Sequence, residues 1–100
     1  MKPFAFHPEA DTEFIATLER YAAISAELGD RFYDEVHRLI GEAGAMPKIF
    51  RIIYPPARRV LAQDFPFGII YVDQPDRIWI LALMHLHRAP DYWKHRLPVA

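Results

Sequence analysis

Histidine and arginine side chains gather toward the end of the chain, and their types suit proton transfer and phosphate binding. His85 and His87 stand two residues apart in an apolar segment, and Arg88 follows directly. Histidine exchanges a proton near neutral pH, and the guanidinium fork of arginine binds phosphate through paired hydrogen bonds. Arg58 and Arg59 form a second basic group earlier in the chain. The ordinary alternative is that His85 is hydrogen-bonded to backbone and that Arg58 or Arg59 pairs with an acid.

A metal site is another chemistry that these residues allow. His85 and His87 project from one face of an extended segment, because side chains alternate along a strand, and His95 follows nearby. No carboxylate stands at a suitable spacing, and the absence of cysteine excludes thiolate ligands. We therefore expect no metal and no other cofactor. The aromatic residues Trp79 and Trp93 could stack on bases, but packing is their commoner role.

Charge is distributed unevenly along the chain. Residues 1–44 hold four bases against nine acids, a net −5, whereas residues 45–100 hold eight bases against four acids, a net +4. The overall charge of −1 therefore conceals a dipole. This pattern predicts either a basic surface that attracts anions or two solvated surfaces of opposite sign.

The composition is that of one folded domain. The chain has 100 residues, of which 52% are hydrophobic and 25% charged, so disorder is excluded and residues 1–100 should form a single domain. Acids appear early and no signal-peptide core precedes them. The longest apolar run, Ile78 to Met84, is too short to span a membrane. We expect a cytoplasmic protein without membrane association.

Hydrophobic spacing predicts an α+β fold. Apolar residues recur at helical intervals over 9–24 and then from Ser25, the expected N-cap, toward Gly41 and Gly44. Strands are expected at 4–7, 57–62, 68–72 and 77–87, with an extended stretch at 50–54 and a short helical segment at 91–97. The order β-α-α-β-β-β places a helical hairpin on one face of an antiparallel sheet.

The last expected strand is apolar on both faces. Strict alternation puts the even-numbered residues from Ile78 to Leu86 on one face and the odd-numbered residues from Trp79 to His87 on the other. Two helices cover only one face of a sheet, so a partner or the chain's own Tyr92 and Trp93 must cover the second. We favour the partner, because an exposed apolar patch usually binds another molecule.

Several segments together resemble the RelE/ParE family, the toxins of bacterial type II toxin–antitoxin pairs. They are His7-Pro8-Glu9-Ala10 with Glu13, Tyr21, Leu28-Gly29-Asp30-Arg31-Phe32, Glu35-Val36, Arg58-Arg59-Val60-Leu61, Phe65 to Tyr71, Ile78 to Leu83, and His85, Arg88, Pro90, Trp93 and Arg96. No single segment is specific, but their order and spacing extend over nearly the whole chain. The resemblance implies a growth-inhibiting toxin of the kind used in plasmid stabilization.

In this family a cognate antitoxin neutralises the toxin within a heteromeric complex. The resemblance implies that a strand or helix of the antitoxin is captured on the basic and apolar surface. The residues expected to contact it are Trp79, Leu81, Leu83, Trp93, Arg58 and Arg96.

The family offers two mechanisms. RelE-like members cleave mRNA on the ribosome, which requires a base, an acid and cations around one phosphate. In that case His85 would be the base or acid, Arg59 and Arg88 would hold the phosphate, and Tyr92 would be a second proton carrier.

ParE-like members instead inhibit DNA gyrase and have no nuclease centre. The sequence pI is about 6.5, lower than expected for a protein that settles on RNA. Only Lys48 and Arg51 stand near the place of the lysine cluster of nuclease members, and residues 88–93 resemble the ParE branch more closely. We therefore favour a toxin that is not an enzyme, with the endoribonuclease as the alternative.

Overall fold

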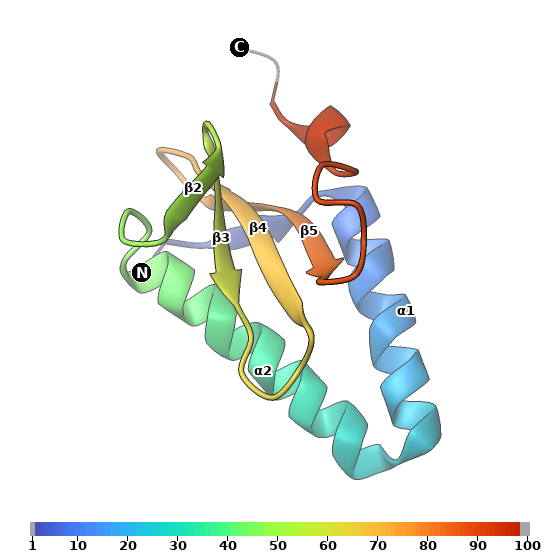
Figure 1. Cartoon of the computed structure of the whole chain (residues 1–100). Helices are drawn as coiled ribbons and strands as arrows, with labels where there is room; N and C mark the ends of the chain where they lie inside the picture. Colours follow the sequence, from blue (N-terminus) through green and yellow to red (C-terminus); the bar gives the residue numbers. More distant parts are fainter. Residues whose placement is uncertain (1, 99–100) are drawn as a thin grey trace.

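The computed structural model describes residues 2–98, which form two helices and a five-stranded sheet (Figure 1). The elements are β1 (Phe4–Phe6), α1 (Pro8–Ile24), α2 (Ala26–Ala45), β2 (Arg51–Tyr54), β3 (Ala57–Leu61), β4 (Phe67–Asp73), β5 (Ile78–His85) and a terminal 3-10 turn, η1 (Lys94–Arg96). The predicted α+β class is confirmed. None of the helices in residues 2–98 is both long and apolar enough to cross a bilayer.

The sheet is mixed, with the strand order β1-β5-β4-β3-β2. Strands β2 to β5 pair antiparallel, as predicted, but β1 lies parallel to β5, with Phe4 opposite Ile78. The extended stretch before Pro55 becomes the edge strand β2, so the sheet has one strand more than the predicted order. The expectation of a wholly antiparallel sheet is therefore wrong at the β1 edge.

Local sequence signals explain how the two helices begin. Pro8 opens α1, where a missing N–H costs nothing, and the backbone N–H of Glu9 donates to His7 Nδ1 at 3.0 Å. Ser25 caps α2, as predicted, by accepting from the N–H of Leu28 at 3.0 Å. A Cβ on Gly29 would lie 2.9 Å from Ala22 Cβ, so this glycine lets the helices approach closely.

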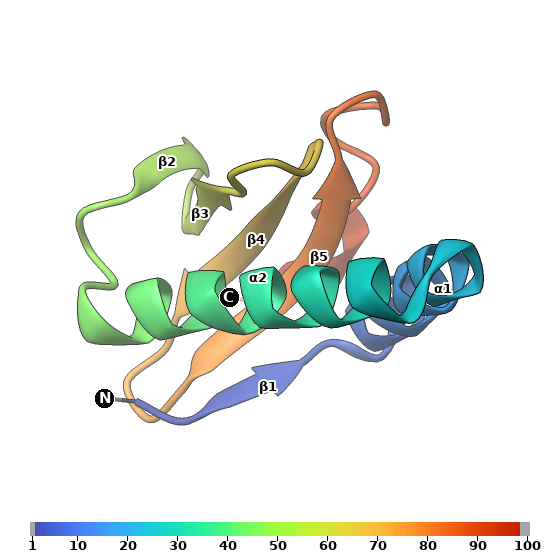
Figure 2. The ribbon, with the colours of Figure 1, turned by 90° about the horizontal axis from the view of Figure 1, so that it is seen from below.

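The helix α2 runs to Ala45, one residue past Gly44, so its end agrees with the predicted region of Gly41 and Gly44, and both glycines keep helical conformation. Its buried stripe rests on the sheet and includes Phe32, Val36 and Leu39, in line with the helical spacing of apolar residues after Ser25. Figure 2 shows α2 passing across β4 and β5, and Figure 1 shows α1 beside β5 and the two helices diverging from their shared turn.

An irregularity in β5 changes which residues share a face. Ile70 pairs with Ala82 but Tyr71 pairs with Ile80, so Leu81 is an extra residue in the ladder. Ile80 and Leu83 consequently both face the helices, whereas Leu81 and Met84 face away. The predicted strict alternation is wrong beyond this point, because a β-bulge shifts the phase of the side chains that follow.

The face of the sheet opposite the helices is covered by the chain's own tail. Trp93 is 1% exposed and packs in a second core cluster with residues that include Ile70, Leu81 and Met84. Its indole Nε1 donates to the carbonyl of Pro90 at 2.9 Å, so the buried polar atom is satisfied. Within residues 2–98, the apolar face of the sheet that was predicted to require a partner is therefore covered and not open to solvent.

Glu35 joins α2 to the segment after β3, and its side chain is only 11% exposed. Its carboxylate accepts from Arg38 Nε at 2.7 Å and from the backbone N–H of Gln63 at 2.6 Å. The hydrogen bond from Arg38 is the main cause that lowers the pKa of Glu35, and burial opposes it.

The lowered pKa of Glu35 predicts an acid-sensitive contribution to stability. A carboxyl group whose pKa is depressed by folding stabilises the protein above its unfolded pKa, and this contribution is lost as pH falls through the folded pKa. Glu35→Gln should lower the free energy of unfolding by about 1 kcal/mol at pH 7 and by much less near pH 3. Urea unfolding at both pH values measures this, with the exposed Asp34→Asn as control. A loss that is equal at both pH values would contradict the role of the charge.

Candidate functional site

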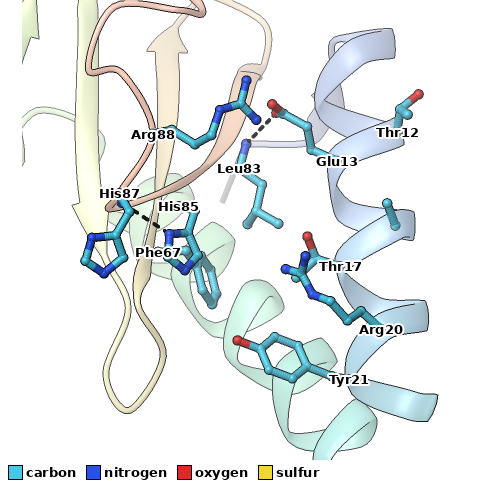
Figure 3. A pocket seen from close by; sticks show the side chains of 11 residues that line it. Thr12, Glu13, Thr17, Arg20, Tyr21, Phe67, Leu83, His85, His87 and Arg88 are labelled. Atoms are coloured by element: carbon cyan, nitrogen blue, oxygen red, sulfur yellow. Dashed lines mark hydrogen bonds between the residues drawn. The ribbon is translucent and has the colours of Figure 1, made fainter. Parts of the chain in front are cut away.

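The larger of two hollows described on the molecule is a groove of about 690 Å³ between α1 and the end of β5 (Figure 3). Its α1 wall consists of Thr12, Glu13, Ala16, Thr17, Arg20 and Tyr21, and its other wall consists of Phe67, Leu83, His85, His87 and Arg88. The α1 residues recur three and four positions apart, which places them on one side of a helix. Polar and charged groups thus surround an apolar floor.

The bulge in β5 brings His85 into this groove. Past Leu81 the side chains change face, so His85 joins Leu83 on the helix side instead of the tail side. Its Nδ1 accepts from the backbone N–H of His87 at 3.2 Å, and the two imidazole rings lie 5.1 Å apart between centroids. This hydrogen bond agrees with the alternative that His85 is a strand residue bonded to backbone. The imidazole ring of His85 nevertheless lines the groove.

Arg88 and Tyr92 lie together beside the groove. The guanidinium carbon of Arg88 stands 4.0 Å from the ring centroid of Tyr92, which is a cation–π contact. The Tyr92 hydroxyl donates to Glu13 Oε2 at 2.6 Å. Burial, followed by this bond to Glu13, raises the pKa of Tyr92. A phenol that holds its proton this firmly is poorly suited to the proton transfer predicted for it.

Arg59 is separated from His85 by the sheet. It lines a smaller cleft of about 290 Å³ on the tail side, together with Met84, Trp93 and Lys94. The next residue, Val60, packs in the helix-side core, as alternation along β3 requires. The structure therefore brings His85 and Arg88 together and leaves Arg59 on the opposite face.

A buried ion pair fastens the tail to α1. Arg96 Nη1 donates to Glu13 Oε1 at 2.8 Å and to the carbonyl of Leu81 at 2.9 Å, and the backbone N–H of Leu83 reaches the same carboxylate oxygen at 3.2 Å. Arg96 Nε lies 2.7 Å from Glu9 Oε2 but does not have hydrogen-bond geometry, so this contact is an ion pair only. Burial disfavours the charge of Arg96, but the effects of Glu13, followed by those of Tyr92 and Glu9, together outweigh it, so the pKa of Arg96 is raised.

The sequence did not predict this anchor. Glu13 was noticed as part of a family motif, and Arg96 as a partner-binding residue. Their separation of 83 positions leaves no local pattern that could pair them. The only available signal was the general rule that a carboxylate near an apolar helix face needs a cation.

The surface predicted to bind a partner is mostly internal. Leu81, Leu83, Trp93 and Arg96 are buried within the chain, so a partner would reach them only after displacing the tail, and their role in partner binding stays a prediction. Two residues of that set keep some exposure. The guanidinium carbon of Arg77 lies 4.1 Å from the ring centroid of Trp79. Arg58 Nη1 donates to the carbonyl of Phe50 at 2.8 Å.

The three histidines considered as metal ligands do not meet. His95 Nε2 lies 2.7 Å from Glu9 Oε2, on the anchor between the tail and α1, whereas His85 and His87 line the groove. Across residues 2–98, no three histidine, aspartate or glutamate side chains are grouped so that they could hold a metal ion.

Comparison with solved structures identifies the fold. The chain is similar to a chain of the structure titled "Chromosomal ParDE TA system from P. aeruginosa", with a TM-score of 0.61 and 13% identity. The match covers 87% of this chain and 98% of that chain. No family model and no curated protein matches the sequence. At this level of identity the likeness establishes the fold, and the predicted RelE/ParE-like architecture is confirmed.

Proposed function

We propose that this protein is the toxin of a type II toxin–antitoxin pair, held inactive in the cytoplasm by a cognate antitoxin. The likeness to a chain of a ParDE system supports this, together with the sequence motifs that carry the family resemblance. We further propose that the free toxin inhibits DNA gyrase by binding and does not cut RNA.

The observation that carries the proposal of gyrase inhibition without RNA cleavage is the separation of Arg59 from His85. Cleavage of a phosphodiester needs proton carriers and cations around a single phosphate. Here the sheet stands between Arg59 and His85, and the Tyr92 hydroxyl is bonded to Glu13. The four residues predicted for a nuclease therefore do not surround one point.

The alternative function is a ribosome-dependent endoribonuclease. One observation favours it, because His85, His87, Arg20 and Arg88 line the same groove. Two imidazoles and two guanidiniums are the groups that such chemistry uses, although the set differs from the one the sequence predicted.

A pair of assays separates the two functions. The purified protein should block supercoiling by gyrase with no ribosome present, and it should leave a reporter mRNA intact during coupled translation. Cleaved transcripts with normal supercoiling would refute the gyrase proposal in favour of the nuclease. Expression alone should arrest growth, and co-expression of the product of a small adjacent gene should restore it.

Two variants sharpen this comparison. If the protein acts by binding gyrase, His85→Ala should still arrest growth. If it is a nuclease centred on the groove, His85→Ala should lose at least about a hundredfold of its cleavage rate. Arg59→Ala, on the opposite face of the sheet, is the matched control for groove chemistry.

A further inference from the structure

The groove between α1 and β5 carries positive charge that no carboxylate of the described chain neutralises. Arg20 and Arg88 form no ion pair within residues 2–98. The single acid of the lining, Glu13, is already bound by Arg96 at 2.8 Å. Arg88 stacks on the Tyr92 ring at 4.0 Å, and neither guanidinium is paired with a carboxylate of the described residues, so both can still donate hydrogen bonds to an anion.

The two arginines reach the groove from opposite walls. Arg20 extends from α1 and Arg88 from the segment after β5, and Figure 3 shows the head group of Arg88 beside Glu13 and that of Arg20 beside Thr17, further along the groove. His85 and His87 lie side by side next to Phe67. The side chains of Thr17 and Tyr21 add hydroxyl groups on the α1 wall. Guanidinium forks, imidazoles and hydroxyls are the usual ligands of a phosphate group.

The size and floor of the groove indicate a ligand larger than a bare ion. About 690 Å³ falls in the range of small-molecule sites and exceeds what one phosphate needs. Phe67 and Leu83 belong to the core cluster and form an apolar floor, and the half-buried ring of Tyr21 borders it. Such a floor suits a planar ring attached to the phosphate.

We propose that this groove is a binding site for a phosphomonoester that carries an aromatic ring, such as a nucleoside monophosphate. Arg20 and Arg88 bind the phosphate from the two walls, and the ring lies over the floor near Tyr21. The site goes beyond the proposed function, since neither antitoxin capture nor gyrase inhibition requires a small ligand.

Isothermal titration of the purified full chain tests this proposal directly. Adenosine monophosphate should bind with one-to-one stoichiometry, whereas adenosine and inorganic phosphate should each bind at least about tenfold more weakly. Arg20→Ala and Arg88→Ala should each weaken binding by about tenfold or more, because each removes a charge-assisted hydrogen bond. Arg51→Ala, an exposed arginine of β2 outside the groove, should leave the affinity unchanged.

Several results would overturn the site. They are the absence of binding at millimolar nucleotide, equal affinity for inorganic phosphate, and an affinity that Arg20→Ala and Arg88→Ala leave intact. Displacement by a glutamate-rich peptide that itself binds more tightly would assign the groove to an acidic protein segment instead. Arg20 is exposed, so Arg20→Ala should fold, and Arg20→Lys should restore part of the affinity. Titration uses no gyrase or ribosome, so its outcome is independent of the toxin assays.

Discussion

Replacing Glu13 with alanine is expected to lower the free energy of unfolding by about 3–5 kcal/mol. The carboxylate binds the Arg96 guanidinium, the Tyr92 hydroxyl and the backbone N–H of Leu83. Its removal leaves Arg96, whose side chain is 6% exposed, as a buried cation without its main partner. Urea unfolding followed by circular dichroism measures the loss.

A double-mutant cycle distinguishes the ion pair from simple loss of packing. Glu13→Ala combined with Arg96→Ala should cost less than the sum of the two single changes, because the double variant leaves no buried charge behind. Glu9→Ala is the matched control, since Glu9 is an exposed carboxylate of α1 that contacts the same arginine, and it should have little effect. Additive losses in the cycle would contradict a coupled anchor.

The helices and the fold class could be predicted because their signals are local. The Pro8 start, the Ser25 cap and the apolar stripe through Phe32 and Val36 each follow from neighbouring residues. The tertiary contacts of the site were not predictable in this way. Arg59 and His85 are both basic residues on strands, and only the three-dimensional sheet shows that they face opposite sides.

The bulge at Leu81 is the feature that most affected the predicted site. Strict alternation placed His85 and Leu83 on the same face as Trp79, and one extra residue in the ladder moved them to the helix side. No residue type at this point marks a bulge, because Leu81 and Ala82 are ordinary strand residues. His85 thus reaches the groove because of the way β5 pairs with β4. This pairing cannot be read from the sequence of β5 alone.

The second large effect is expected from Trp93→Ala, which should lower the free energy of unfolding by about 3–5 kcal/mol. Trp93 fills the space between the tail and the sheet, and its loss leaves a cavity against Leu81 and Met84. The tail should then detach more often and expose apolar surface, so the variant should bind a hydrophobic dye that the parent protein does not. Trp79→Ala, at a half-buried position stacked on Arg77, is the control and should cost less.

The same tryptophan reports on whether the tail covers the sheet in solution. The chain has two tryptophans, so Trp79→Phe leaves Trp93 as the sole indole. Its emission should be that of a buried ring and should resist a soluble quencher. Red-shifted, readily quenched emission from the folded Trp79→Phe variant would mean that the tail is displaced and the apolar face is open. The predicted partner surface on Leu81 and Trp93 would then become available, because any partner that binds this face must first remove the tail from it.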